Sequence, residues 1–174
     1  RIFDQGAKLV ANAVADGSLY EGAGWRQVME RATSAGATLH FLGLLSDGNV
    51  HSHQDHLHAL MTAAKQAGVA KVRVHVLFDG RDVPQKSAET YVERLTAHIG
   101  ELESAAFDVK VASGGGRMVV TMDRYEADWD MVAKGWRTHV LGKGTRFESL
   151  DAALAAGRDD PELTDQYLPP FMIA

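Results

Sequence analysis

The chain has 174 residues, of which 45% are hydrophobic and 24% charged, an ordinary balance for a soluble globular domain that excludes a disordered tail. Its formal charge of −5 excludes bulk attraction to nucleic acid, and no apolar run approaches the roughly 18 residues of a membrane span. Cysteine is absent, which excludes disulfides, thiolate metal sites and a cysteine nucleophile. We expect one domain in a reducing, cytoplasmic compartment, with a small molecule as its partner.

Helical and strand-like patterns alternate along the chain. Apolar periodicity and capping residues predict helices over 4–16, 24–35 and 53–67, after Ser87, and after a capping box formed by Asp123 and Glu126. Short apolar or alternating runs predict strands at 38–45, where both faces should be buried, at 72–78 and at 107–111. The three glycines at 114–116 should end the third strand. The apolar run at 171–174 is interpreted as the start of another strand in a longer protein.

The order strand, loop, helix occurs three times. It predicts an α/β domain with a mostly parallel sheet and helices on both faces. Ligands in such domains bind at the carboxyl ends of the strands, where the connecting loops gather. We therefore expect the loops 46–53, 79–86 and 113–124 to lie side by side.

The first loop, together with the beginning of the helix that follows it, contains His51, His53, Asp55 and His56. This HxHxDH spacing matches the metallo-β-lactamase superfamily, in which such residues bind two zinc ions that activate water. The alternative is that the histidines lie solvated in the first helical turns. The loop alone does not decide between these interpretations.

The second loop places Arg81 directly before Asp82. A guanidinium can clamp a carboxylate or phosphate, and a neighbouring carboxylate can accept a hydroxyl proton. The alternative is an ordinary turn with an Arg–Asp pair.

The third loop combines the glycines 114–116 with Arg117 and Arg124. It lacks the Lys-Ser/Thr of a Walker A motif, and each arginine alone is as well explained as a surface residue. Together, however, the three strand ends supply Arg81, Arg117 and Arg124 to one edge of an acidic protein. This coincidence predicts a site for a small polyanion, such as a substrate that carries both a carboxylate and a phosphate.

Four motifs in order resemble the 2,3-bisphosphoglycerate-independent phosphoglycerate mutases. They are GLLSDGNVHSH at 43–53, LFDGRDVPQKSA at 77–88, VASGGGRMVVTMDRYEADWDMV at 111–132 and DQYLPPFMI at 165–173. Two features depart from the common pattern: Asn49 stands where glycine is more usual, and Arg117 and Arg124 are one residue further apart than in the common bacterial form.

The resemblance implies that residues 1–174 form the inserted phosphotransferase domain of a two-domain enzyme that interconverts 3-phosphoglycerate and 2-phosphoglycerate through a phosphoserine. The serine, two manganese ions with their ligands, and a further arginine pair would lie outside this chain, in an enzyme that is a monomer and needs no 2,3-bisphosphoglycerate. The residues that match the family's substrate contacts are His51, Arg81, Asp82, Arg117 and Arg124, with Asp82 as the acid/base and His51 beside it in the catalytic set.

The resemblance makes the HxHxDH match accidental and leaves this chain without a metal site of its own. Two alternatives stay open: a metallo-hydrolase that uses His51, His53, Asp55 and His56, and a binding module for carboxylate or phosphate that performs no chemistry.

Overall fold

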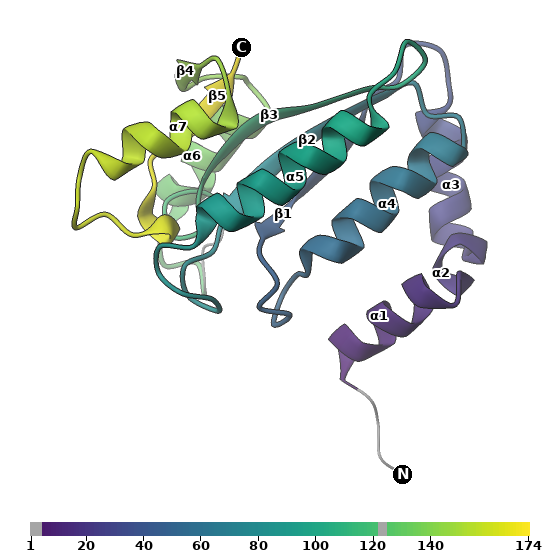
Figure 1. The fold of residues 1–174 in the computed structure, drawn as a ribbon, viewed down its shortest axis with the longest axis horizontal. Coiled ribbons are helices and arrows are strands. Elements are labelled where there is room, and N and C mark those ends of the chain that lie inside the picture. Colours follow the sequence, from purple (N-terminus) through teal and green to yellow (C-terminus); the bar gives the residue numbers. More distant parts are fainter. Residues whose placement is uncertain (1–4, 122–124) are drawn as a thin grey trace.

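The computed structural model describes residues 5–121 and 125–174, and in these ranges the chain forms an α/β domain around a five-stranded sheet (Figure 1). The helices are α1 (Gly6–Ala15), α2 (Ser18–Glu21), α3 (Ala23–Ala32), α4 (Gln54–Gln66), α5 (Ala88–Leu102), α6 (Trp129–His139) and α7 (Leu150–Arg158), with a 3-10 turn, η1, at Asp165–Tyr167. The strands are β1 (Leu39–Leu45), β2 (Lys71–Phe78), β3 (Asp108–Gly116), β4 (Thr145–Phe147) and β5 (Phe171–Ile173). No helix in the described ranges is long and apolar enough to cross a membrane.

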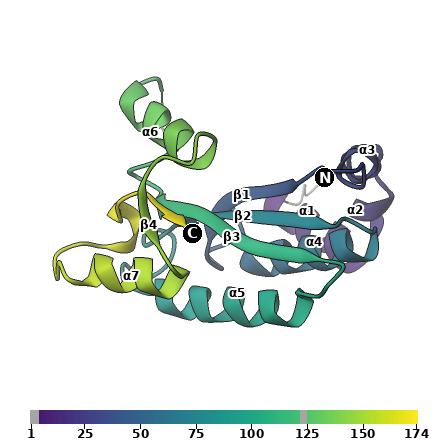
Figure 2. The same cartoon turned by 90° about the horizontal axis from the view of Figure 1, so that it is seen from above.

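The sheet is mostly parallel, as predicted. Its strand order is β1-β2-β3-β5-β4, and β5 runs antiparallel to β3 but parallel to β4. Figure 2 shows α4, α5 and α7 on one face of the sheet and α6 on the other. The strand predicted at 171–174 is confirmed as β5, and it joins β3 to β4.

The core lies between β2 and the helices α4 and α5. Every residue of β2 from Val74 to Phe78 is buried, because the strand has neighbours on both sides. Met61 of α4 and Val92 and Leu95 of α5 are fully buried with it, at the helical spacing that the sequence indicates. This burial of apolar surface is the main force that holds the two layers together.

β1 is less buried than predicted. Leu44 and Leu45 are buried, but Leu42 in its centre is 51% exposed. β1 lies at the edge of the sheet, and the face opposite α4 and α5 is covered mainly near β3, where α6 packs. Apolar character alone did not distinguish this edge strand from a central one.

The prediction that three glycines end the third strand is wrong, because β3 continues through Gly114 and Gly115 to Gly116. A Cβ atom on Gly114 would lie 2.4 Å from the Phe171 ring, and one on Gly116 would lie 2.3 Å from the carbonyl oxygen of Gln166. The glycines therefore allow the segment 166–171 to pass directly against the strand.

Two helices have other capping side chains than predicted, although α5 begins directly after Ser87 as expected. Ser87 precedes α5, but its hydroxyl donates to Pro84, and the carboxylate of Asp165 accepts the backbone N–H groups of Ser87 and Ala88 at 2.8 Å instead. α6 is capped by Asp128, which accepts from the Met131 N–H, rather than by Asp123, which lies outside the described residues. Asp4, expected to start the first helix, also lies outside them.

Candidate anion-binding site at the strand ends

The three parallel strands end at the same level. Leu45 of β1 is in register with Phe78 of β2, and Phe78 is in register with Gly116 of β3. The next residues in the chain are therefore neighbours across the edge of the sheet. They are Ser46, Asp79 and Arg117.

These three residues form a buried polar row. The Ser46 hydroxyl donates to Oδ2 of Asp79 at 2.6 Å, and Nη1 of Arg117 donates to Oδ1 of Asp79 at 2.7 Å. All three residues are nearly inaccessible, with whole-residue exposures of 1% for Ser46, 2% for Asp79 and 5% for Arg117. The row thus connects all three loops of the candidate site.

The same guanidinium reaches Asp82. Nη1 of Arg117 lies 2.7 Å from Oδ2 of Asp82, whose side chain remains 15% exposed. Asp79 also accepts the backbone N–H groups of Arg81 at 3.2 Å and Asp82 at 3.1 Å. A buried carboxylate therefore fixes both the turn that carries Asp82 and the arginine that pairs with it.

The electrostatics of the row favour charged side chains. Burial by itself would raise the pKa of Asp79, but hydrogen bonds from Ser46, the Asp82 N–H, Arg117 and the Arg81 N–H outweigh it and lower this pKa below the ordinary value. Burial opposes the charge of Arg117 as well, and the two carboxylates overcome it, so that the pKa of Arg117 is raised. Asp79 and Arg117 therefore form a buried ion pair, and Asp82 lies on the other side of the same guanidinium.

The first loop is attached to this cluster and to α5. Gly48 passes so close to Asp82 that a Cβ atom on Gly48 would lie 2.8 Å from the Asp82 Cβ. The Tyr91 hydroxyl donates to Asp47 at 2.6 Å, and burial followed by the Asp47 contact raises the pKa of Tyr91 to about 12. Asn49 has a φ of 56°, a left-handed conformation that glycine and asparagine adopt most readily. That backbone conformation accounts for Asn49 at a position where glycine is more usual.

The predicted site residues are brought together in part. Asp82 and Arg117 are in direct contact, although 35 residues separate them. Arg81 and His51 are exposed, on the second and first loops respectively. Arg124 lies outside the described residues.

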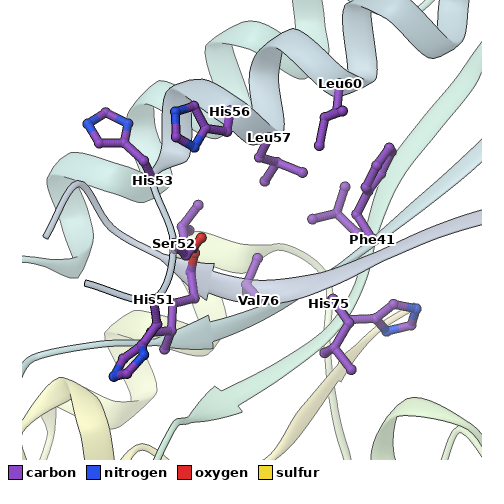
Figure 3. A pocket seen from close by; sticks show the side chains of 14 residues that line it. Phe41, His51, Ser52, His53, His56, Leu57, Leu60, His75 and Val76 are labelled. Carbon is purple, nitrogen blue, oxygen red and sulfur yellow. Dashed lines mark hydrogen bonds between the residues drawn. The ribbon is translucent and has the colours of Figure 1, made fainter. Parts of the chain in front are cut away.

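The four residues of the HxHxDH pattern do not form a metal cage. His53 is the N-cap of α4 and accepts from the Asp55 N–H, while the Asp55 carboxylate pairs with Arg94 at 2.6 Å. His51 points away from His53 and His56 in Figure 3. Within residues 5–121 and 125–174, no group of three His, Cys, Asp or Glu side chains is placed to hold a metal ion.

A cavity of about 220 Å³ lies between β1 and α4, beside the first loop (Figure 3). Its interior is lined by apolar side chains such as Phe41, Leu57 and Leu60, and His51 stands at its border. The cluster of Asp79, Asp82 and Arg117 does not line it. The cavity is therefore separate from the charged part of the site.

Sequence reasoning missed Ser46 and Asp79. Both lie within the loops that the sequence singles out, each directly after an apolar strand. That position is a usable signal, because in a parallel sheet the first polar residues after neighbouring strands meet at one edge. Their burial and pairing were not evident, since the partners lie 33 and 38 residues apart.

The fold and this cluster define an α/β domain with a charged site at the carboxyl ends of its parallel strands. The sequence profile described as "BPG-independent PGAM N-terminus" matches residues 10–174. The chain belongs to this family, the 2,3-bisphosphoglycerate-independent phosphoglycerate mutases, and corresponds to their N-terminal portion.

Individual relatives agree with this assignment. The chain is 50% identical to a probable 2,3-bisphosphoglycerate-independent phosphoglycerate mutase of Leptospira interrogans, over 100% of this chain and 32% of the relative. It is 49% identical to the 2,3-bisphosphoglycerate-independent phosphoglycerate mutase of Zea mays, over 99% of this chain and 31% of that protein. The crystal structure of Leishmania mexicana phosphoglycerate mutase at low cobalt concentration superposes with a TM-score of 0.97 at 44% identity, over 100% of this chain and 32% of that one. The chain thus spans about a third of the length of these relatives.

Proposed function

We propose that this chain supplies the glycerate-binding half of a phosphoglycerate mutase that interconverts 3-phosphoglycerate and 2-phosphoglycerate. The observation that carries the proposal is the Arg117–Asp82 pair at the edge where the three parallel strands end. The names of the relatives supply the substrate class. The enzyme would act in the cytoplasm as a monomer and would need no 2,3-bisphosphoglycerate.

Within the site, the exposed Arg81 and His51 would meet the carboxylate and phosphate first, together with Arg124. Arg117 would contribute its remaining donors. Its Nε is buried and has no hydrogen-bond partner among the described residues, so a substrate oxygen could satisfy it. Asp82, held by Arg117 yet 15% exposed, would accept the proton of a glycerate hydroxyl.

The proposed chemistry transfers one phosphoryl group twice. A serine loses its hydroxyl proton as it takes the phosphoryl group of 3-phosphoglycerate, and the 3-oxygen that leaves takes up a proton, so that glycerate stays bound to this domain. The glycerate turns without leaving, Asp82 takes the proton of its 2-hydroxyl, and the resulting oxygen attacks the phosphoserine. The bond between the phosphorus and the serine oxygen breaks, which forms 2-phosphoglycerate and restores the serine. A clamp on the glycerate carboxylate is needed at the middle stage, when no covalent bond holds the molecule.

The domain division is part of the proposal. Residues 1–174 would be the phosphotransferase domain. In a polypeptide as long as the relatives, the remaining residues would form an alkaline-phosphatase-like domain that carries the serine and two manganese ions. The described residues do not fit such a metal centre, because none of their acidic and imidazole groups form a set of three ligands. No step assigned to this chain uses a metal.

Titration of this chain with 3-phosphoglycerate by calorimetry or NMR, next to a coupled mutase assay, tests the proposal. We expect weak binding and no turnover. Arg81→Ala should weaken the binding, whereas Arg146→Ala, an exposed arginine on β4, should not. Absence of binding by the unmodified chain, or turnover that survives removal of trace full-length enzyme, would contradict the assignment of this chain to the glycerate-binding half.

A further inference from the structure

We propose that Asp79 is a positioning residue for this site, one that holds Arg117 and thereby sets the orientation of Asp82. The inference deepens the proposed function and rests on it for the identity of the ligand. The position of Asp79 in the fold and its contacts are independent of that identity.

Asp79 contacts every loop of the site. It is the first residue after β2, and its two oxygens accept the hydroxyl of Ser46 from the first loop, two backbone N–H groups from its own loop, and Nη1 of Arg117 from the end of β3. Both carboxylate oxygens are used, and the side chain is 1% exposed. A substrate would therefore meet the groups that Asp79 holds, rather than Asp79 itself.

A single nitrogen of Arg117 joins the two carboxylates. Nη1 lies 2.7 Å from Oδ1 of Asp79 and 2.7 Å from Oδ2 of Asp82. Without the Asp79 contact, Asp82 would be the remaining carboxylate partner of the guanidinium among the described residues, and the Asp82 backbone N–H would lose its acceptor as well. Buried arrangements of this kind hold a reacting group within a narrow range of positions, which acid/base chemistry requires.

The charges of the cluster give the proposal a distinctive consequence. Two carboxylates lie against the single charge of Arg117, so the proposed attraction for an anion rests mainly on the exposed Arg81. Asp79→Asn keeps the size of the side chain and an oxygen that can accept from the two backbone N–H groups and from Arg117, but it removes the negative charge that strengthens the bond to Arg117. The variant should therefore bind a simple anion as well as the unmodified chain or better, while holding Arg117 and Asp82 less firmly.

The test compares inorganic phosphate with 3-phosphoglycerate as ligands of the unmodified chain, Asp79→Asn and a matched control, Asp151→Asn, in an exposed first-turn position of α7. We expect Asp79→Asn to retain phosphate binding but to lose roughly tenfold of its preference for 3-phosphoglycerate, because a hydrogen bond between ionised groups is about twice as strong as one with a neutral partner. In the same samples, NMR signals of the Arg117 side-chain N–H groups should shift and exchange faster with water. The control should change neither property.

An unchanged ligand preference and unchanged Arg117 signals in folded Asp79→Asn would overturn the proposal. If that variant does not fold, Ser46→Ala decides the question: it removes one donor from the Asp79 carboxylate, and it should move the Arg117 signals in the same direction by a smaller amount. Unmoved signals would again overturn the proposal. If the unmodified chain does not bind 3-phosphoglycerate, the proposed function fails, and the Arg117 signals alone still test the role of Asp79.

Discussion

Arg117 and Asp82 are 35 residues apart in the chain, and their side chains meet at 2.7 Å at the edge of the sheet. The partner of Asp82 is thus Arg117, the residue after β3, rather than its sequence neighbour Arg81, which is exposed. The pair is partly buried, so solvent screens it less than a surface ion pair. It places a carboxylate where a bound hydroxyl could reach it.

Asp82→Asn in a full-length enzyme that contains this domain should keep the shape of the loop and remove the proposed base. We expect turnover to fall by a factor on the order of 10²–10⁴, the usual contribution of a positioned acid/base. A coupled assay measures the loss, with Asp55→Asn at the surface of α4 as the control. Near-normal turnover would mean that another group moves the proton.

The metal content of the isolated chain separates the mutase from the metallo-hydrolase. Since His53 caps α4 and Asp55 pairs with Arg94, we expect no stoichiometric zinc or manganese after dialysis, as measured by elemental analysis. Two zinc ions per chain would restore the hydrolase, and their loss in His51→Ala would then locate them.

Gly116→Ala should destabilise the domain. The new methyl group would lie 2.3 Å from the Gln166 carbonyl, and the backbone there cannot move without breaking the bond from the Gly116 N–H to the Leu168 carbonyl. We expect a loss of about 1–3 kcal/mol or more in the free energy of unfolding, measured with urea. Gly43→Ala on β1 is the matched control, because a Cβ atom there meets nothing within 4 Å. Equal stability of the two variants would contradict the close approach.

Lowering the pH should reduce the free energy of unfolding before most carboxylates are protonated. Burial lowers the pKa of His58 to about 4, and the charges of His98 and Arg94 contribute to this shift. Burial also lowers the pKa of His75 to about 4, with smaller contributions from His139 and His40. Below the ordinary value of 6.5 the unfolded chain binds protons that the folded chain does not, so the free energy of unfolding falls as the pH drops from about 6.5 to 4.

Urea denaturation at several pH values measures this slope. His75→Asn, which removes one of these two imidazoles, should make the slope between pH 6.5 and 4 shallower. A slope that is the same in the unmodified chain and in His75→Asn would show that His75 is not the group responsible.

Local sequence patterns predicted most of the secondary structure. β1, β2 and α4 lie within one or two residues of the predicted limits, and α5 begins directly after Ser87 as predicted, because periodicity and helix stops depend on residues close together in the chain. The helix predicted at 4–16 is α1, followed after a short break by α2. The end of β3 was mispredicted, since glycines favour turns locally and only the chain at 166–171 shows why they stand in a strand here.

For the site, the sequence by itself determined the three loops, the residues that could bind an anion or move a proton, and the family. Only the tertiary structure decided which of those residues meet: Arg117 with Asp82, Ser46 with Asp79, and Asp165 with the start of α5, 77 residues away. For the first two contacts the physical reason is that parallel strands align in register and bring distant chain segments to one edge. Local propensity contains no information about that alignment, whereas the burial of the sheet between its helices imposes it.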